Sequence, residues 1–276
     1  MKQSRLGLTI AIIVLLVIAG LAVFPFYWMF VTATTPTSNF YDESAQLFPN
    51  LANLGNFFGA FTDTPMLSWL GNSAIVATGT MVLAVAFGVP TAYALSRFSF
   101  RGKAIVGLSL FLTQMLPEAV LVVPLFSIFA ALGLINSLFG LILVNAAFVM
   151  PVVTLVLMGA IDGVPTEIDE AARVDGATRV GVLTRMVIPI IAPSLAAVAV
   201  IAFFHGWNEY IFALTFTTQD SLHTASVGLA GFIGELTTPT QQVMSVAIVY
   251  TLPAVALYLL LQRFIVSGIA AGSVKG

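Results

Sequence analysis

A small set of polar and aromatic residues lies inside long apolar segments of this chain. The set is Glu118, Asn145, Trp207, Asn208 and Glu209. An ionisable side chain within a membrane costs at least about 2.5–3.5 kcal/mol, so its presence there marks a functional position by default. We therefore expect these side chains to line a central polar path with an aromatic face beside it. The alternative is that the polar groups hydrogen-bond neighbouring helices and that Trp207 belongs to an interfacial aromatic belt.

The sequence gives little support to catalytic or metal chemistry. It has no cysteine and two histidines, His205 and His223, which excludes thiolate chemistry and disulfides and leaves almost no basis for a zinc site. Around Gly102-Lys103 the phosphate-binding pattern G-x-x-x-x-G-K-[ST] fails, because Arg97 stands at its first glycine and Ala104 at its hydroxyl. We expect no enzymatic activity and no cofactor in this chain.

The composition is that of an integral membrane protein. Hydrophobic residues make up 59% of the 276 residues and charged residues 8%, whereas charged residues are roughly 25% of a soluble domain. The mean hydropathy is +1.04. The net charge is −2 and the ten basic residues fall in separate clusters, so no continuous basic stripe exists for nucleic acid and we expect no nucleic-acid partner.

Six apolar segments are each long enough, at 1.5 Å per residue, to cross a hydrocarbon core of about 30 Å. They predict an all-α polytopic membrane protein, a single domain over residues 1–276. The expected spans are residues 8–31, 69–95, 104–132, 138–160, 193–216 and 243–266. All ten basic residues then fall on one side, so the positive-inside rule predicts that both termini and the loop 161–192 face the cytosol.

Loop 161–192 carries a pattern of two short helices joined by a turn. Thr166 and Asp169 have capping-box spacing after Pro165, and Asp175-Gly176 is a turn signal. An apolar stripe of Val180, Leu183, Met186 and Val187 predicts the second helix. The loop is expected to be a compact surface for something outside the membrane; the alternative is a solvated amphipathic loop lying on the membrane surface.

The order Glu170-Ala171-Ala172, three residues, Gly176 and then Ile188-Pro189 resembles the EAA coupling loop of inner-membrane permease subunits of bacterial carbohydrate ABC importers. Asp175-Gly176-Ala177 matches the sugar permeases too, whereas Leu183, Met186 and Ile188 depart from their usual residues by apolar exchanges. The tail, from Gln262-Arg263-Phe264 to Gly272-Ser273-Val274-Lys275-Gly276, is similar to that of the maltose-type second permease subunit.

This resemblance implies the type I permease fold of ABC importers, in a multi-pass protein of the bacterial inner membrane. It implies three kinds of partner besides membrane lipid: a second homologous permease subunit, two cytosolic ATPase subunits that bind ATP and Mg, and an extracytoplasmic solute-binding protein. It also implies a set of ATPase-coupling residues: Glu167, Glu170, Ala171, Ala172, Asp175, Gly176, Ala177, Pro189 and Lys275.

Two functional alternatives stay open at this point. The same machinery imports other solutes, such as a glycerophosphodiester or a polyol, and nothing in the spans identifies one ligand. The second alternative is a self-sufficient channel or secondary carrier, in which Glu118 and Glu209 would be the ionisable groups.

Overall fold

The computed structural model describes residues 5–36, 46–62, 64–234 and 240–272, and these residues form helices and connecting segments without a strand. Contacts divide the chain into two compact units. Unit 1 comprises residues 1–67 and 229–252, and unit 2 comprises residues 68–228 and 253–276. The all-α prediction is therefore confirmed for the described residues.

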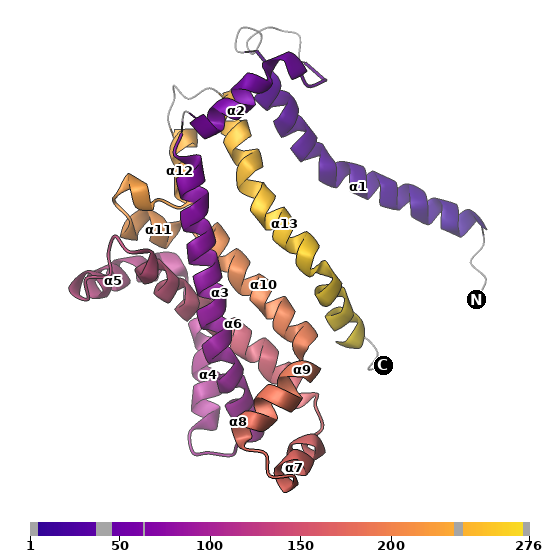
Figure 1. Cartoon of the computed structure of the whole chain (residues 1–276), viewed down its shortest axis with the longest axis vertical. Coiled ribbons are helices and arrows are strands. Elements are labelled where there is room, and N and C mark those ends of the chain that lie inside the picture. The colour runs from indigo at the N-terminus through magenta and orange to yellow at the C-terminus, as the bar shows by residue number, and fades with distance from the viewer. Residues whose placement is uncertain (1–4, 37–45, 63, 235–239, 273–276) are drawn as a thin grey trace. The chain divides into compact units, whose positions relative to one another are not determined.

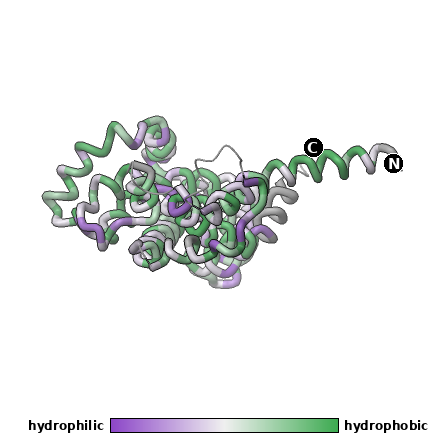
Figure 2. Tube along the Cα trace, turned by 90° about the horizontal axis from the view of Figure 1, so that it is seen from above, coloured by the Kyte–Doolittle hydropathy of each residue, from purple (hydrophilic) through white to green (hydrophobic). Residues whose placement is uncertain are grey.

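Unit 1 is built around the long N-terminal helix α1 (Arg5–Thr34), which contains the predicted span 8–31. The helix is apolar along most of its length, as Figure 2 shows. After it come the 3-10 turn η2 (Leu51–Asn53) and α2 (Leu54–Thr62). The Tyr27 hydroxyl donates to Leu47 O at 2.6 Å and Asn50 N donates to Thr34 Oγ1 at 3.2 Å, so this segment folds back onto the end of α1.

Unit 2 has its core where α3 (Met66–Arg97), α6 (Leu138–Asp162) and α10 (Ala192–Asn208) pack together (Figure 1). Each of the three helices contributes buried residues to that core, for example Val89, Val153 and Val198. A Cβ added to Gly206 would lie 3.0 Å from Ala77 Cα, so glycine lets the backbones of α10 and α3 approach closely.

The expected third span, 104–132, is not one straight helix. The helices α4 (Lys103–Thr113) and α5 (Glu118–Ala131) meet at an angle of 106°. Pro117 caps α5 in an extended conformation, and proline both lacks an N–H and disfavours a helical residue before it. The predicted span 104–132 thus consists of a bent pair of helices.

The expected fifth span, 193–216, is also interrupted. Helix α10 ends at Asn208, Glu209 is extended with ψ 132°, and α11 (Ile211–Phe216) follows. At its other end, α10 meets the preceding helical segment at 85°. Four helices of the described chain are long and apolar enough to cross a membrane, and the number is six if each bent pair forms one span.

The remaining described elements are short, except for the last helix. They are α7 (Thr166–Val174), α8 (Arg179–Val182), the π-helical turn η3 (Leu183–Val187), α9 (Ile188–Ile190), η4 (Asp220–Leu222), α12 (Ala225–Gly234) and α13 (Thr240–Gly272).

Candidate functional site

Loop 161–192 forms two short helices and a turn, as its sequence pattern predicts. Helix α7 ends at Val174, and Gly176 has φ +86°, a left-handed conformation that favours glycine. Thr178 begins the second helix, because its Oγ1 accepts the N–H of Gly181 at 3.1 Å. The second helix forms as predicted; in its apolar stripe Leu183 and Val187 are buried, and Val180 and Met186 are exposed.

The predicted capping box does not form. The residue at the N-cap is Pro165, and no side chain caps α7. Asp169 instead turns inward and is 9% exposed. The Asp169 carboxylate therefore forms an ion pair with a residue distant in the sequence, in place of the local capping hydrogen bond that its position in the sequence favours.

Asp169 binds the end of α3. Its Oδ2 lies 3.1 Å from Arg97 Nε and accepts the Tyr93 hydroxyl at 3.2 Å. Arg97 Nη2 also donates to Val164 O at 2.6 Å, just before α7. Tyr93 and Arg97 are four residues apart on one helix, so both side chains leave the same face. The sequence analysis did not predict these contacts, although the spacing of Tyr93 and Arg97 near a basic helix end was an available signal.

Two further contacts hold the same region. Ser96 Oγ donates to Asp162 Oδ1 at the end of α6. The Arg179 guanidinium of α8 lies 4.4 Å from the centre of the Phe98 ring, a cation–π contact. The last turn of α3 and the residue after it therefore contact α6, α7 and α8.

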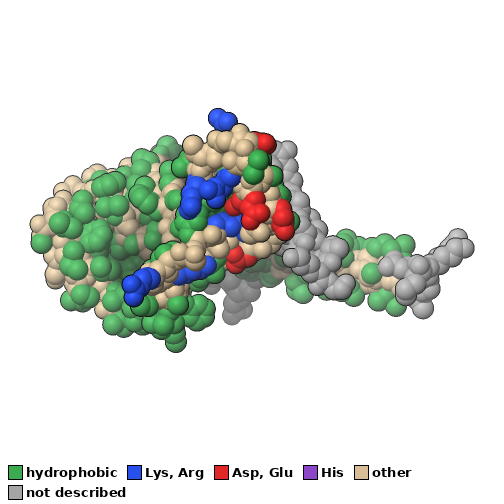
Figure 3. All heavy atoms as spheres, turned by 90° about the horizontal axis from the view of Figure 1, so that it is seen from below, with side chains coloured by type: hydrophobic (Ala, Val, Ile, Leu, Met, Phe, Trp, Pro, Cys, Tyr) green, Lys and Arg blue, Asp and Glu red, His purple; other side chains and the backbone are tan. Residues whose placement is uncertain are grey.

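Most of the proposed coupling residues lie on the outside of this loop. Exposed members are Glu167, Glu170, Ala171, Asp175, Gly176 and Pro189, whereas Ala172 is buried and Ala177 half-buried. Val174, at the end of α7, is 87% exposed although it is apolar. Figure 3 shows Asp and Glu side chains beside Lys and Arg side chains on this end of unit 2. Lys275 lies outside the described residues.

This exposed surface carries charges of both signs and an apolar side chain. It combines carboxylates at the start of α7, Arg173 near its end and an exposed valine. Because α7 is fixed to α3 behind that surface, a force applied to α7 acts on a long helix of the core.

A second candidate site is a polar pocket of about 190 Å³ at the break between α4 and α5. Glu118 Oε1 lies 3.9 Å from His205 Nε2, across the pocket from α10. Gln114 Nε2 donates to Phe148 O at 3.1 Å. The residues lining the pocket are Thr113, Gln114, Leu116, Glu118, Phe148, Val149, Val152, Ile201 and His205.

The other four residues expected along a polar path do not line this pocket. Asn145 is fully buried and donates from Nδ2 to Leu141 O at 2.8 Å. Trp207 is 1% exposed and stacks on Phe203 with ring centres 5.7 Å apart. Asn208 is exposed. Of the five, Glu118 alone lines the described polar pocket.

Glu209 lies at the break between α10 and α11 and caps the start of α11. Its carboxylate oxygens accept the N–H groups of Phe212 at 2.6 Å and Ala213 at 2.9 Å. The Ser226 hydroxyl donates to the Glu209 carbonyl at 2.6 Å. The carboxylate therefore satisfies the first turn of a helix, where free N–H groups attract negative charge.

His205 is one of the polar pocket residues, with Gln114, that the sequence analysis did not place on the path. It is 87 positions from Glu118 in the sequence, and only the packing of α10 beside the break at Pro117 brings the two together. The signal that was available was a histidine within an apolar segment.

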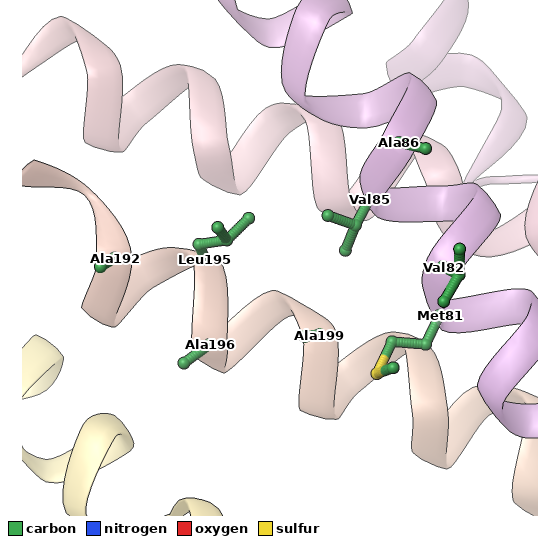
Figure 4. Close-up of a pocket in the computed structure, with 8 residues that line it drawn as sticks. All are labelled: Met81, Val82, Val85, Ala86, Ala192, Leu195, Ala196 and Ala199. Carbon is green, nitrogen blue, oxygen red and sulfur yellow. The ribbon is translucent and has the colours of Figure 1, made fainter. Parts of the chain in front are cut away.

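A larger apolar pocket of about 560 Å³ lies between α3 and α10 (Figure 4). Its lining residues are Met81, Val82, Val85, Ala86, Ala192, Leu195, Ala196 and Ala199. Such a surface offers packing for apolar groups and no polar recognition.

Comparisons with known proteins agree with this architecture. Residues 84–270 match the family model described as binding-protein-dependent transport system inner membrane component. The sulfoquinovosyl glycerol transport permease SmoH of Agrobacterium fabrum is 33% identical over 95% of this chain and 91% of that protein. The trehalose transport permease SugB of Mycobacterium tuberculosis is 35% identical over 94% of each chain.

The trehalose/maltose transport permease MalG of Thermococcus litoralis is 32% identical over the whole of both chains. Among solved structures, a chain of a bacterial ABC transporter that imports the acidic polysaccharide alginate has a TM-score of 0.78 at 21% identity, covering 95% of this chain and 99% of that one. The fold is therefore that of an ABC importer permease. The chain belongs to the family of binding-protein-dependent transport system inner membrane components.

Proposed function

We propose that this chain is the permease subunit of an ATP-driven ABC importer that moves a carbohydrate or sugar-like solute into the cytosol. Coupling to the ATPase subunits is supported by the exposed helix–turn–helix of loop 161–192. The contact between Arg97 and Asp169 fixes this loop behind its proposed docking surface. The names of the similar permeases support a sugar-like solute, since they include trehalose, maltose and sulfoquinovosyl glycerol transporters.

The proposed orientation places both termini and loop 161–192 in the cytosol, because the basic residues cluster at these positions. The partners are a second homologous permease, two ATPase subunits that bind ATP and Mg, and an extracytoplasmic binding protein. A binding protein gains support from a solved alginate transporter complexed with its periplasmic protein, a chain with a TM-score of 0.58 and 17% identity.

The mechanism uses α7 as the element that the ATPase moves. Closure of the ATPase dimer around ATP pulls on exposed Glu167, Glu170 and Ala171. The Asp169–Arg97 contact passes this displacement to α3. Because α3 packs in the core with α6 and α10, the spans rearrange together and the solute-binding region opens to the other side.

The test is to tag the chain at its N-terminus, extract it gently from native membranes and identify the proteins that co-purify by mass spectrometry. The proposal predicts an ATPase, a second polytopic permease and a binding protein. Purification of the chain alone, with solute flux in proteoliposomes that lack an ATPase, would instead establish the channel or carrier alternative. The ligands of the recovered binding protein then separate a sugar from a glycerophosphodiester or a polyol.

A further inference from the structure

We infer that the polar pocket at the α4–α5 break binds one uncharged, hydroxyl-bearing ring of the transported solute and disfavours anionic rings. This inference rests on the proposed import function and adds the substrate class that the pocket selects. Its basis is the chemistry of Gln114, Glu118 and His205 together with the apolar walls around them.

The two ionisable side chains of the pocket retain hydrogen-bonding capacity. Glu118 and His205 are 3.9 Å apart at their nearest N and O atoms, which is beyond hydrogen-bonding distance. Their side chains are 35% and 24% exposed, and both line the same pocket. A hydroxyl group placed between them can donate to the carboxylate and accept from an imidazole N–H.

The walls of the pocket suit the C–H faces of a ring. Phe148, Val149 and Val152 come from α6, and Ile201 comes from α10. The volume of about 190 Å³ lies below the range of roughly 300–1,000 Å³ that is usual for drug-sized ligands. The pocket therefore matches one ring of a longer or branched solute, with the remainder of the solute outside it.

The charge of the pocket favours a neutral ring. Its described lining includes one carboxylate, Glu118, and contains no lysine or arginine. A carboxylate or sulfonate on the solute would face Glu118 in a low-dielectric surrounding, where repulsion between like charges is strong. The pocket thus distinguishes solutes like trehalose from acidic ones, both of which occur among the substances named for the similar transporters.

The test uses the intact purified complex in lipid nanodiscs and two probes that differ in one group, methyl α-glucopyranoside and methyl α-glucuronide. Saturation-transfer NMR measures binding of each probe to the wild type, to Glu118→Gln and to Ser127→Ala. Ser127 is a matched control on α5, since its hydroxyl donates to Val123 O and it does not line the pocket.

We expect the wild type and Ser127→Ala to bind the glucopyranoside and to bind the glucuronide at least tenfold more weakly. Glu118→Gln keeps the shape but removes the charge, so it should weaken glucopyranoside binding by about tenfold and strengthen glucuronide binding. No binding of the glucopyranoside by the wild type, or equal effects of Glu118→Gln on both probes, would overturn the inference. Co-purification of the ATPase is scored separately, so the import function survives either result.

Discussion

Arg97 Nε lies 3.1 Å from Asp169 Oδ2, and this contact joins the last residue of α3 to the first turn of α7. The two side chains are 8% and 12% exposed. The Tyr93 hydroxyl also donates to the same carboxylate oxygen. The contact connects the short loop helix to the long core helix.

Replacing Asp169 by Asn should uncouple ATP hydrolysis from transport. Asn keeps the size of the side chain but leaves the Arg97 charge without its partner, and removing one member of a buried pair costs more than removing both. Solute uptake should fall at least tenfold while the ATPase remains associated. The measurement is uptake per ATP hydrolysed in proteoliposomes containing the complete transporter.

Arg101→Ala is the control for that experiment, because Arg101 is exposed and close to Arg97 in the sequence. It should leave uptake per ATP near the wild-type value. The exchanged pair Arg97→Asp with Asp169→Arg should recover part of the loss. Wild-type coupling in Asp169→Asn would show that the contact does not carry the motion.

Replacing Gly176 by Val should disrupt docking or coupling while leaving membrane insertion intact. Nothing lies within 4 Å of a Cβ at this position, so the cost comes from φ +86° and not from a clash. Left-handed backbone costs an ordinary residue roughly 1–2 kcal/mol. ATPase retention on the tagged, purified permease measures the effect.

Two matched variants show whether the backbone conformation is the cause. Gly176→Asn should retain most ATPase, since Asn tolerates the left-handed region. Gly159→Ala lies in α6 with nothing within 4 Å of the added Cβ and should behave as wild type. Full ATPase retention and normal uptake in Gly176→Val would count against the role of this turn.

Replacing Glu209 by Ala should destabilise the protein, because two N–H groups of α11 lose their acceptor. Loss of a helix cap costs about 0.5–2 kcal/mol, so the thermal unfolding temperature of the purified complex should fall by a few degrees. Glu209→Gln keeps one acceptor oxygen, so its unfolding temperature should lie between those of the wild type and Glu209→Ala. An unchanged unfolding temperature with lost uptake would instead support the path-lining role expected for Glu209 from the sequence.

The sequence predicts the helical elements well because their signals are local. Apolar length located α1, α3, α6 and α13, and the Asp175-Gly176 turn separated the two helices of loop 161–192. The break in the third span also had a local signal, Pro117.

The candidate sites were less predictable because they depend on contacts between distant residues. Asp169 has capping-box spacing in the sequence, yet Arg97, 72 positions earlier, binds its carboxylate. Glu209 has the burial expected of a path residue and also caps α11, and Trp207 packs on Phe203. His205 joins Glu118 only through tertiary packing.

Cross-linking from loop 161–192 tests the proposed coupling most directly. A cysteine at Ala171, which is exposed, is introduced into this cysteine-free chain, with a cysteine at exposed Asp220 as the control. With a short reagent that is thiol-reactive at one end and photoreactive at the other, used in native membranes, we predict a cross-link from Ala171→Cys to the ATPase subunit. Its yield should change when ATP is added, and Asp220→Cys should give none. Failure of Ala171→Cys to reach an ATPase in either nucleotide state, in a complex that retains that subunit, would contradict coupling through this loop.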